Sequence, residues 1–403
     1  MWSSLSLTTA SLSKNFHRLP AFVIKFHIMN KVFLILYFLI LYSVNAFSQN
    51  TDNNADNPSG YNDGPYIFYK GPDVHIYSAM KTDTGVKVNH DIKSLQDLKD
   101  LEFTVNTNTE LPAFKVKLFK YKDSPSTYKQ RGKTVVISDI HGNFFNYVKL
   151  LKNAAVISDS YTWTFGKNNL VVNGDIFDRG ADVTAVLWLT YKLDAESRKA
   201  GGSVIFNFGN HEDMVLTGDL RYMDEKYDLF SKRIGVDFTE FFSRDTELGR
   251  WLRTKNVMTT IGDILFVHGG ISREVVKSGL KPQKINDIMR TGIGTALNPA
   301  DSIAIMLFGD RGPLWYRGLV IPSETELINA DTIDVSLAHF KVSKIIVGHT
   351  TLSRVSALHG GRVIGVDAAV KEALFIDNGK LEVLTTEGEF KELPVSKGFY
   401  NKH

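Results

Sequence analysis

Carboxylate, carboxamide and imidazole side chains follow short apolar runs at five places in the chain. The runs are VVI (135–137), LVV (170–172), VIFNF (204–208), ILFV (264–267) and IIV (345–347). Each run is too short and too rich in β-branched residues to be a helix, so each predicts a buried strand. The polar residues that come just after these strands include Asp139, His141, Asp175, Asn210, His268 and His349.

The residue types at these strand ends are those of a metal site. Asp139 and His141 are two positions apart, so on an extended segment both would point the same way and could bind one cation. Asp175 has two carboxylate oxygens and could bridge two cations. The second cation would be completed by Asn210, His268 and His349. These donors suit two divalent or trivalent ions such as Mn, Fe or Zn. Two ions about 3.5–4 Å apart would share a hydroxide and clamp the oxygens of an in-line phosphoryl displacement.

Composition excludes several other kinds of chemistry. The chain has no cysteine, which rules out disulfides, thiolate metal sites and a cysteine nucleophile. Its formal charge is +3, but residues 1–48 hold four basic residues and no acid, so the remainder carries 3 − 4 = −1. A near-neutral body has no basic surface for nucleic acid, and we expect no nucleic-acid partner.

The elements that position these residues predict an α/β architecture. Helix-like patterns follow the first three apolar runs, and strands that alternate with helices indicate a layered α/β fold. Sites in open α/β sheets lie beyond the carboxyl ends of the strands, so five strand ends would meet in one crevice. Two insertions should overhang it: a helical one over about 219–256, and some 75 residues before the fifth strand, with a helix that begins after Ser272. Asn378-Gly379 predicts a tight hairpin near the end of the chain.

The N-terminus has the pattern of a secretory signal. Residues 32–44 form a charge-free apolar run after Lys31, and Ala46 and Ser48 are small residues suited to cleavage after Ser48. The run is short for a membrane span, although an uncleaved anchor is the alternative. We therefore expect a periplasmic or secreted protein that meets the membrane only through this segment.

The remaining sequence divides into regions by composition. Residues 1–48 are predicted to be an N-terminal extension and signal peptide, with Met29 as the start of translation, and residues 49–62 a disordered linker. Residues 63–130 form a β-rich accessory region that ends in a polar connector, residues 131–390 the catalytic domain, and residues 391–403 a C-terminal tail. His75 and His90 lie in the accessory region without a chemical motif, and no role is assigned to them.

The motifs together resemble a known family. The segments DIHG, GDIFDRG, GNHE, VHGGIS and VGHT resemble the phosphoprotein phosphatase branch of the calcineurin-like metallophosphoesterases. GDRGPLWYRG (309–318) resembles the bacterial Shewanella-like phosphatases in particular. The resemblance covers about residues 131–370. It implies an α+β fold in which a central two-sheet β-sandwich is flanked by helices.

The resemblance also implies a role for each site residue. Asp139, His141 and Asp175 would bind one metal ion, and Asp175 would bind the other together with Asn210, His268 and His349. His211 would be the general acid, oriented by Asp178, while Arg179 and Arg317 would bind the phosphate. The chain departs from eukaryotic members at Ser138, where they have glycine, and in lacking their pattern between the last strands. Docking of regulatory subunits is therefore not expected.

These features predict a metal-dependent phosphoric ester hydrolase. The expected reaction is hydrolysis of phosphate monoesters, on phosphorylated protein (Ser/Thr or Tyr) or on small phosphoesters, by a metal-bridging hydroxide with His211 as the acid. A dinucleoside polyphosphate hydrolase would use a similar site, although export of the protein argues against a cytoplasmic nucleotide. A non-catalytic phosphate-binding module is the third possibility, and the intact ligand set with His211 argues against it.

Overall fold

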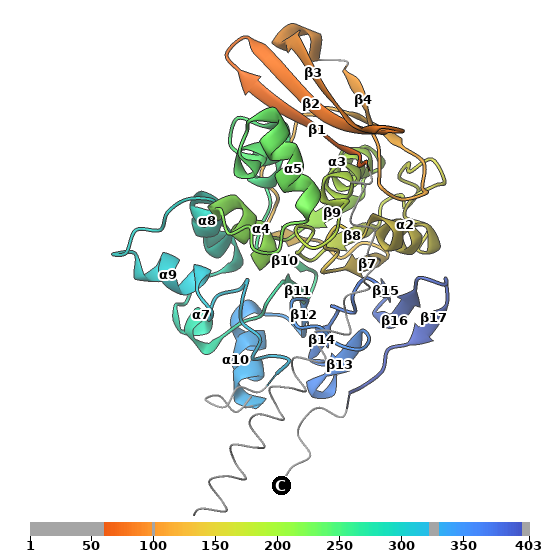
Figure 1. The fold of residues 1–403 in the computed structure, drawn as a ribbon. Helices are drawn as coiled ribbons and strands as arrows, with labels where there is room; N and C mark the ends of the chain where they lie inside the picture. Colours follow the sequence, from red (N-terminus) through yellow and green to blue (C-terminus); the bar gives the residue numbers. More distant parts are fainter. Residues whose placement is uncertain (1–59, 99–100, 322–329, 397–403) are drawn as a thin grey trace, which may run out of the picture. The chain divides into compact units, whose positions relative to one another are not determined.

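Two six-stranded sheets face each other in the computed structural model, which describes residues 60–98, 101–321 and 330–396 (Figure 1). One sheet has the order β17-β16-β15-β7-β8-β9, and the other β13-β14-β12-β11-β10-β6. The predicted two-sheet sandwich flanked by helices is thereby confirmed. The expected signal peptide, most of the linker and the last residues of the tail lie outside the described residues.

The central strands are β7 (Thr134–Ile137), β8 (Asn169–Val172), β9 (Ser203–Phe206), β11 (Ile264–Val267) and β12 (Lys344–Val347). Their side chains alternate between two cores. Val136, Val171 and Ile205 face the other sheet, whereas their neighbours face the layer of helices. Burial on both faces explains why these strands are continuous apolar runs in the sequence.

Parallel pairing places the ends of these strands at one level. Ile137 pairs with Val172, and Val172 with Phe206, in the first sheet. In the second sheet Val267 pairs with Val347. The residues after all five strands therefore leave the sandwich at the same edge, as the sequence predicts.

Helices follow the first three of these strands. They are α2 (Phe144–Asn153), α3 (Val183–Ala200) and α4 (Asn210–Thr217). The side chain of Asn143 caps α2 by accepting the backbone N–H of Asn146. The first half of α3 is buried on every side, with Trp188 and Leu189 fully enclosed, so this helix anchors one side of the sandwich.

Both predicted insertions are helical. The first contains α5 (Glu225–Ile234), the 3₁₀ helix η2 (Phe238–Phe242) and α6 (Glu247–Leu252). The second contains α7 (Arg273–Lys277), α8 (Pro282–Gly292), α9 (Ser302–Phe308) and α10 (Ala330–Phe340). Ser272 caps α7 through the N–H of Val275, as expected. In the described parts of the chain, no helix combines the length and the apolarity that crossing a membrane would need.

The region before β7 is β-rich. A three-stranded antiparallel sheet contains β1 (Asp63–Lys70), β2 (Asp73–Thr82) and β3 (Gly85–Ser94), followed by η1 (Leu95–Leu98) and the pair β4 (Glu102–Val105) and β5 (Phe114–Lys117). Figure 1 shows the three-stranded sheet above α3 and α5. The ring of Tyr66 in β1 packs against that of Phe241 at a centroid distance of 4.3 Å, with the planes tilted by 37°, so this sheet shares the main core.

One part of the predicted polar connector is a strand. β6 (Thr127–Tyr128) pairs in parallel with β10 (Met258–Ile261) at the edge of the second sheet. A strand of two residues is too short to show a hydrophobic period, which is why the sequence conceals it.

The C-terminal strands complete the sandwich. β13 (Ser356–Leu358) and β14 (Val363–Gly365), joined by η3 (His359–Gly361), belong to the second sheet. β15 (Glu372–Asp377), β16 (Lys380–Thr385) and β17 (Phe390–Glu392) belong to the first. Asn378 and Gly379 both have positive φ, 48° and 82°, which is the backbone of the predicted tight hairpin.

Candidate metal centre

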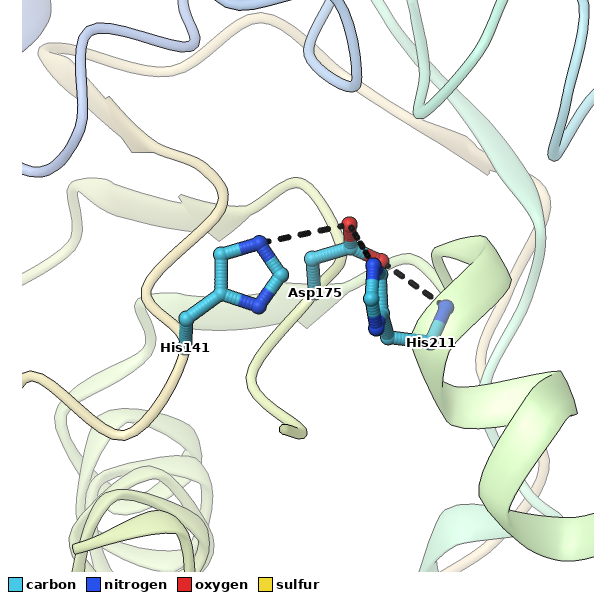
Figure 2. A group of neighbouring side chains, drawn as sticks. All are labelled: His141, Asp175 and His211. Carbon is cyan, nitrogen blue, oxygen red and sulfur yellow. Dashed lines mark hydrogen bonds and ion pairs between the residues drawn. The ribbon is translucent and has the colours of Figure 1, made fainter. Parts of the chain in front are cut away.

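Asp175 lies at the centre of the residues that the five strands deliver. Its Oδ2 atom is 3.2 Å from Nε2 of His268, 3.7 Å from Nε2 of His141 and 3.8 Å from Nε2 of His211. Figure 2 shows two of these imidazoles directed at the carboxylate, with the backbone N–H of His211 on its other oxygen. The Asp175 side chain is only 2% exposed. A buried carboxylate that faces three imidazole nitrogens fits the centre of a cation site.

Two groups of donor atoms share Asp175. One contains His141, Asp175 and His211, and the other Asp175, His268 and His349; within each group the donor atoms lie within 4.8 Å of one another. Asn210 adds its Oδ1 atom 3.1 Å from Nε2 of His268. The shared carboxylate fits the predicted bridging role. His211, predicted to be the acid and not a ligand, lies in the first group as well.

Hydrogen bonds orient three of the imidazoles for cation binding. Nδ1 of His141 is 2.8 Å from the carbonyl of Phe177, and Nδ1 of His268 is 2.8 Å from that of Asn173. Nε2 of His349 is 3.1 Å from the carbonyl of Trp315. A carbonyl can only accept, so each of these nitrogens must donate, and the other ring nitrogen is the one that can bind a cation once it carries no proton. Such outer contacts fix the tautomer of metal-binding histidines, and these residues fit a metal site.

Asp139, predicted to be a metal ligand beside His141, makes its hydrogen bonds with Ser138 and with the loop of His349. Both of its oxygens accept the backbone N–H of His349 at 3.1 Å, and Oδ2 also accepts the hydroxyl of Ser138 at 2.6 Å. It belongs to neither group of donor atoms. Burial raises its pKa well above the usual range. Asp139 therefore links the first and fifth strand ends, and its role as a ligand remains a prediction.

The charges at the site are strongly coupled. Burial alone would lower the pKa of His268, but the carboxylates of Asp175 and Asp139 raise it to about 10. Burial lowers the pKa of His141 to about 4 and that of His349 to about 2. In the absence of a cation, the neighbouring acids thus favour the protonated form of the His268 imidazole. Because a ligand must be deprotonated, cation binding would displace this proton.

Strained backbone surrounds the candidate ligands. Left-handed φ values, between 46° and 69°, occur at Asp139, His141, Asp175, Asp178, Arg179 and His349. Each such residue costs roughly 1 kcal/mol or more and persists only where neighbouring contacts fix it. Gly174 is required for a further reason: a Cβ there would lie 2.5 Å from Nδ1 of His268. The loops are therefore held in a shape that local preference does not favour.

Glu212, for which the sequence predicts no role, supplies much of the contact that holds these loops in place. Its Oε2 accepts the N–H groups of Asp175 at 2.9 Å and Gly209 at 2.6 Å. Its Oε1 accepts those of Ile176 at 2.7 Å and Phe177 at 3.3 Å. The residue is fully buried. One carboxylate therefore holds the loop after β8 against the loop after β9. Its position as the last residue of the GNHE motif is the sequence feature that could have indicated this role.

Buried amides hold the two sheets together beside the site. Asn173 donates to the carbonyl of Val267 at 3.0 Å, and Asn207 donates to that of Phe266 at 3.2 Å. Both bonds cross from the first sheet to β11, so they fix the spacing of the strand ends.

A second residue that the sequence did not reveal is Asp367, a buried acid that accepts the hydroxyl of Thr351 at 2.6 Å. It follows the apolar run of β14, the same signal that revealed the other acids.

His211 and Asp178 form a close pair. Nδ1 of His211 is 2.6 Å from Oδ2 of Asp178, and both side chains are at least 95% buried. The other oxygen of Asp178 is buried with no hydrogen-bond partner in the described residues. The carboxylate fixes the ring and leaves Nε2 of His211 directed toward Asp175. Because Asp178 occupies Nδ1, Nε2 is the ring nitrogen at which His211 can transfer a proton.

The two predicted phosphate-binding arginines lie on different loops of the site. Arg179 is exposed, and its backbone N–H donates to the carbonyl of Tyr222 at 2.8 Å. Arg317 donates to the carbonyl of His349 and lies 3.4 Å from the hydroxyl of Thr350. Burial lowers the pKa of Arg317 from its usual value. The structure therefore brings every predicted site residue to this one edge of the sandwich.

Comparisons with known proteins agree with this geometry. Residues 132–352 match the model of the calcineurin-like phosphoesterase family. The crystal structure of a cold-active protein-tyrosine phosphatase from a psychrophilic Shewanella species is similar, with a TM-score of 0.72 and 36% identity over 82% of this chain and 99% of that chain.

Curated relatives are more distant. Shewanella-like protein phosphatase 2 of Arabidopsis thaliana is 28% identical over 40% of this chain, and Shewanella-like protein phosphatase 1 of Plasmodium berghei is 28% identical over 57%. The chain spans 52% and 64% of the length of these two relatives. The protein belongs to the calcineurin-like phosphoesterase family, has Shewanella-like protein phosphatases among its homologues, and is a phosphoric ester hydrolase.

Proposed function

We propose that this protein is a dimetal-dependent phosphatase that hydrolyses phosphate monoesters of proteins, on Ser/Thr or Tyr, or of small molecules. The observation that carries the proposal is the position of Asp175, whose carboxylate is shared by two groups of imidazole donors. The name of the Shewanella phosphatase, a protein-tyrosine phosphatase, supports a phosphoprotein substrate.

The candidate ligands divide into two sets. Asp139, His141 and Asp175 would bind one ion, and Asp175 would bind the other with Asn210, His268 and His349. Manganese, iron or zinc suits these nitrogen and oxygen donors. When bound, two such ions neutralise phosphate charge and make water nucleophilic at neutral pH.

The protein's own groups then act on the substrate. Arg179 and Arg317 can donate paired hydrogen bonds to the unesterified phosphate oxygens, a geometry that guanidinium groups favour. Cleavage breaks the bond between phosphorus and the ester oxygen, and that oxygen needs a proton to leave as an alcohol. Nε2 of His211 supplies it, while Asp178, 2.6 Å from Nδ1, stabilises the ring's positive charge before transfer.

Activity on a panel of phosphate compounds tests this proposal. The parent protein, loaded with Mn, should hydrolyse phosphopeptides or small monoesters, and excess chelator should abolish the activity. A preference for dinucleoside polyphosphates over all monoesters would favour the alternative hydrolase. Phosphate binding without turnover of any compound would instead indicate a binding module.

We also propose that the mature protein is periplasmic or secreted and begins near Gln49. The support is the apolar run 32–44 with small residues before the expected cleavage point after Ser48. The intact mass of the exported protein should match a chain that starts at or near Gln49. Retention of residues 29–48 in a membrane fraction would indicate the anchor instead.

A further inference from the structure

Tyr222 lies beside the candidate general acid. It belongs to the turn between α4 and α5, and its ring centroid is 5.4 Å from that of His211, with the ring planes tilted by 51°. His211 is 4% exposed, whereas Tyr222 is 47% exposed. The tyrosine therefore touches the buried imidazole with part of its surface and keeps a large part free for another molecule.

The position of Tyr222 is tied to the site. Its carbonyl accepts the backbone N–H of Arg179 at 2.8 Å, which joins the turn to the loop of a candidate phosphate-binding arginine. The guanidinium of Arg221 lies 6.0 Å from the tyrosine ring and is itself paired with Asp219 by hydrogen bonds of 2.8 and 2.6 Å. The backbone of Tyr222 is thus tied to the loop of Arg179, while its ring lies beside the candidate acid.

The position of the leaving group follows from this arrangement. An oxygen that takes a proton from His211 must come within about 3 Å of its ring nitrogen. The organic group on that oxygen then extends away from the phosphate, next to the ring that covers His211. A flat aromatic group would stack or pack edge-on against the exposed tyrosine, while a short aliphatic chain would contact less of it.

We propose that Tyr222 is a specificity-determining residue that contacts the leaving group and favours aryl phosphates, with phosphotyrosine as the protein substrate of that class. This inference rests on the proposed phosphatase function, with His211 as its acid. The tyrosine acts on the substrate and not on the metal ions, since its contacts are with His211, Arg179 and Arg221.

The test compares two phosphopeptides that have the same flanking residues and differ only in phosphotyrosine or phosphoserine. The measured quantity is the ratio of their kcat/KM values, in which effects common to both substrates cancel. Tyr222→Ala should lower the ratio (phosphotyrosine over phosphoserine) by roughly 3–10-fold relative to the parent, the range of one lost aromatic contact. Tyr222→Phe should keep it. Phe390→Ala is the matched control, because Phe390 is 48% exposed but lies on the outer strand β17.

A role in supporting His211 would give the opposite sign. The serine oxygen is a poorer leaving group than the tyrosine phenolate and needs the proton more, so a misplaced acid would slow phosphoserine hydrolysis more, raise the ratio and shift the pH profile of kcat. An unchanged or raised ratio in Tyr222→Ala overturns the inference while the phosphatase function stands. A parent protein inactive on every monoester overturns the proposed function, and this inference with it.

Discussion

Replacing Glu212 by glutamine tests how the site is held in shape. The change preserves size but turns one carboxylate oxygen into an NH₂ group. In either orientation that group faces two backbone N–H donors, because each oxygen accepts two: Asp175 and Gly209 on Oε2, and Ile176 and Phe177 on Oε1. Two hydrogen bonds to a charged acceptor are therefore lost, and buried donors are left unpaired.

The magnitude follows from these contacts. Hydrogen bonds to a charged group contribute about 1.5–3 kcal/mol each, so two lost bonds cost roughly 3–6 kcal/mol. Part of this is recovered, since burial and the nearby Asp175 raise the pKa of Glu212 and so disfavour its charge. We expect the free energy of unfolding of Glu212→Gln to fall by roughly 2–4 kcal/mol. Affinity for Mn should also fall, because the loop that carries Asp175 loosens.

Urea unfolding followed by tryptophan fluorescence measures the first effect, and Mn titration of metal-free protein measures the second. Glu102→Gln is the matched control: Glu102 is a surface acid 3.0 Å from Lys115, and its replacement should change neither quantity. A Glu212→Gln protein with parental stability and Mn affinity would show that the four backbone contacts do not organise the site.

Three further variants test the roles of single residues. His211→Asn should lower kcat by roughly 10²–10⁴ with both metals retained, less for aryl phosphates; equal loss across leaving groups, or loss of metal in mass spectrometry, would contradict the acid role. Arg317→Ala should lower kcat/KM for monoesters by an amount equivalent to roughly 1.5–3 kcal/mol of activation free energy, without changing metal content. Steady-state rates equal to the parent's would refute the role of Arg317 in phosphate binding. Burial raises the pKa of Asp213 to about 6. The folded state therefore binds more protons than the unfolded state between about pH 4 and 6, and stability is lost as pH rises through 6. At pH 7.5, Asp213→Asn should raise the free energy of unfolding by up to about 3 kcal/mol and so raise the Tm, but at pH 4 it should change neither. Equal Tm shifts at both pH values would contradict this.

The strand ends could be predicted because their signal is local. A strand buried on both faces must be apolar throughout, so Val135–Ile137 and Leu170–Val172 stand out, and Asp139 and Asp175 follow within three residues of their ends. Alternating strands and helices already indicate parallel pairing. Parallel pairing places the ends of these strands at one level. The ligands could therefore be assigned to one site before any distance was known.

The missed features depend on contacts that no sequence pattern shows. Glu212 acts through backbone N–H groups of another loop, and Asp139 accepts the N–H of His349, 210 residues away. Tyr222 reaches His211 from an insertion whose path no periodicity determines. β6 pairs through only two residues inside a polar stretch. Each depends on tertiary packing, which determines the partner.

Metal content per chain is the most direct test of the central claim, that Asp175 bridges two ions. Metal-free protein reloaded with Mn should bind two ions per chain by elemental analysis, and phosphatase activity should return with them. Asp175→Asn should lose most of both ions, since each depends on the same carboxylate. One ion per chain in the active parent, or full activity in excess chelator, would contradict the two-metal account.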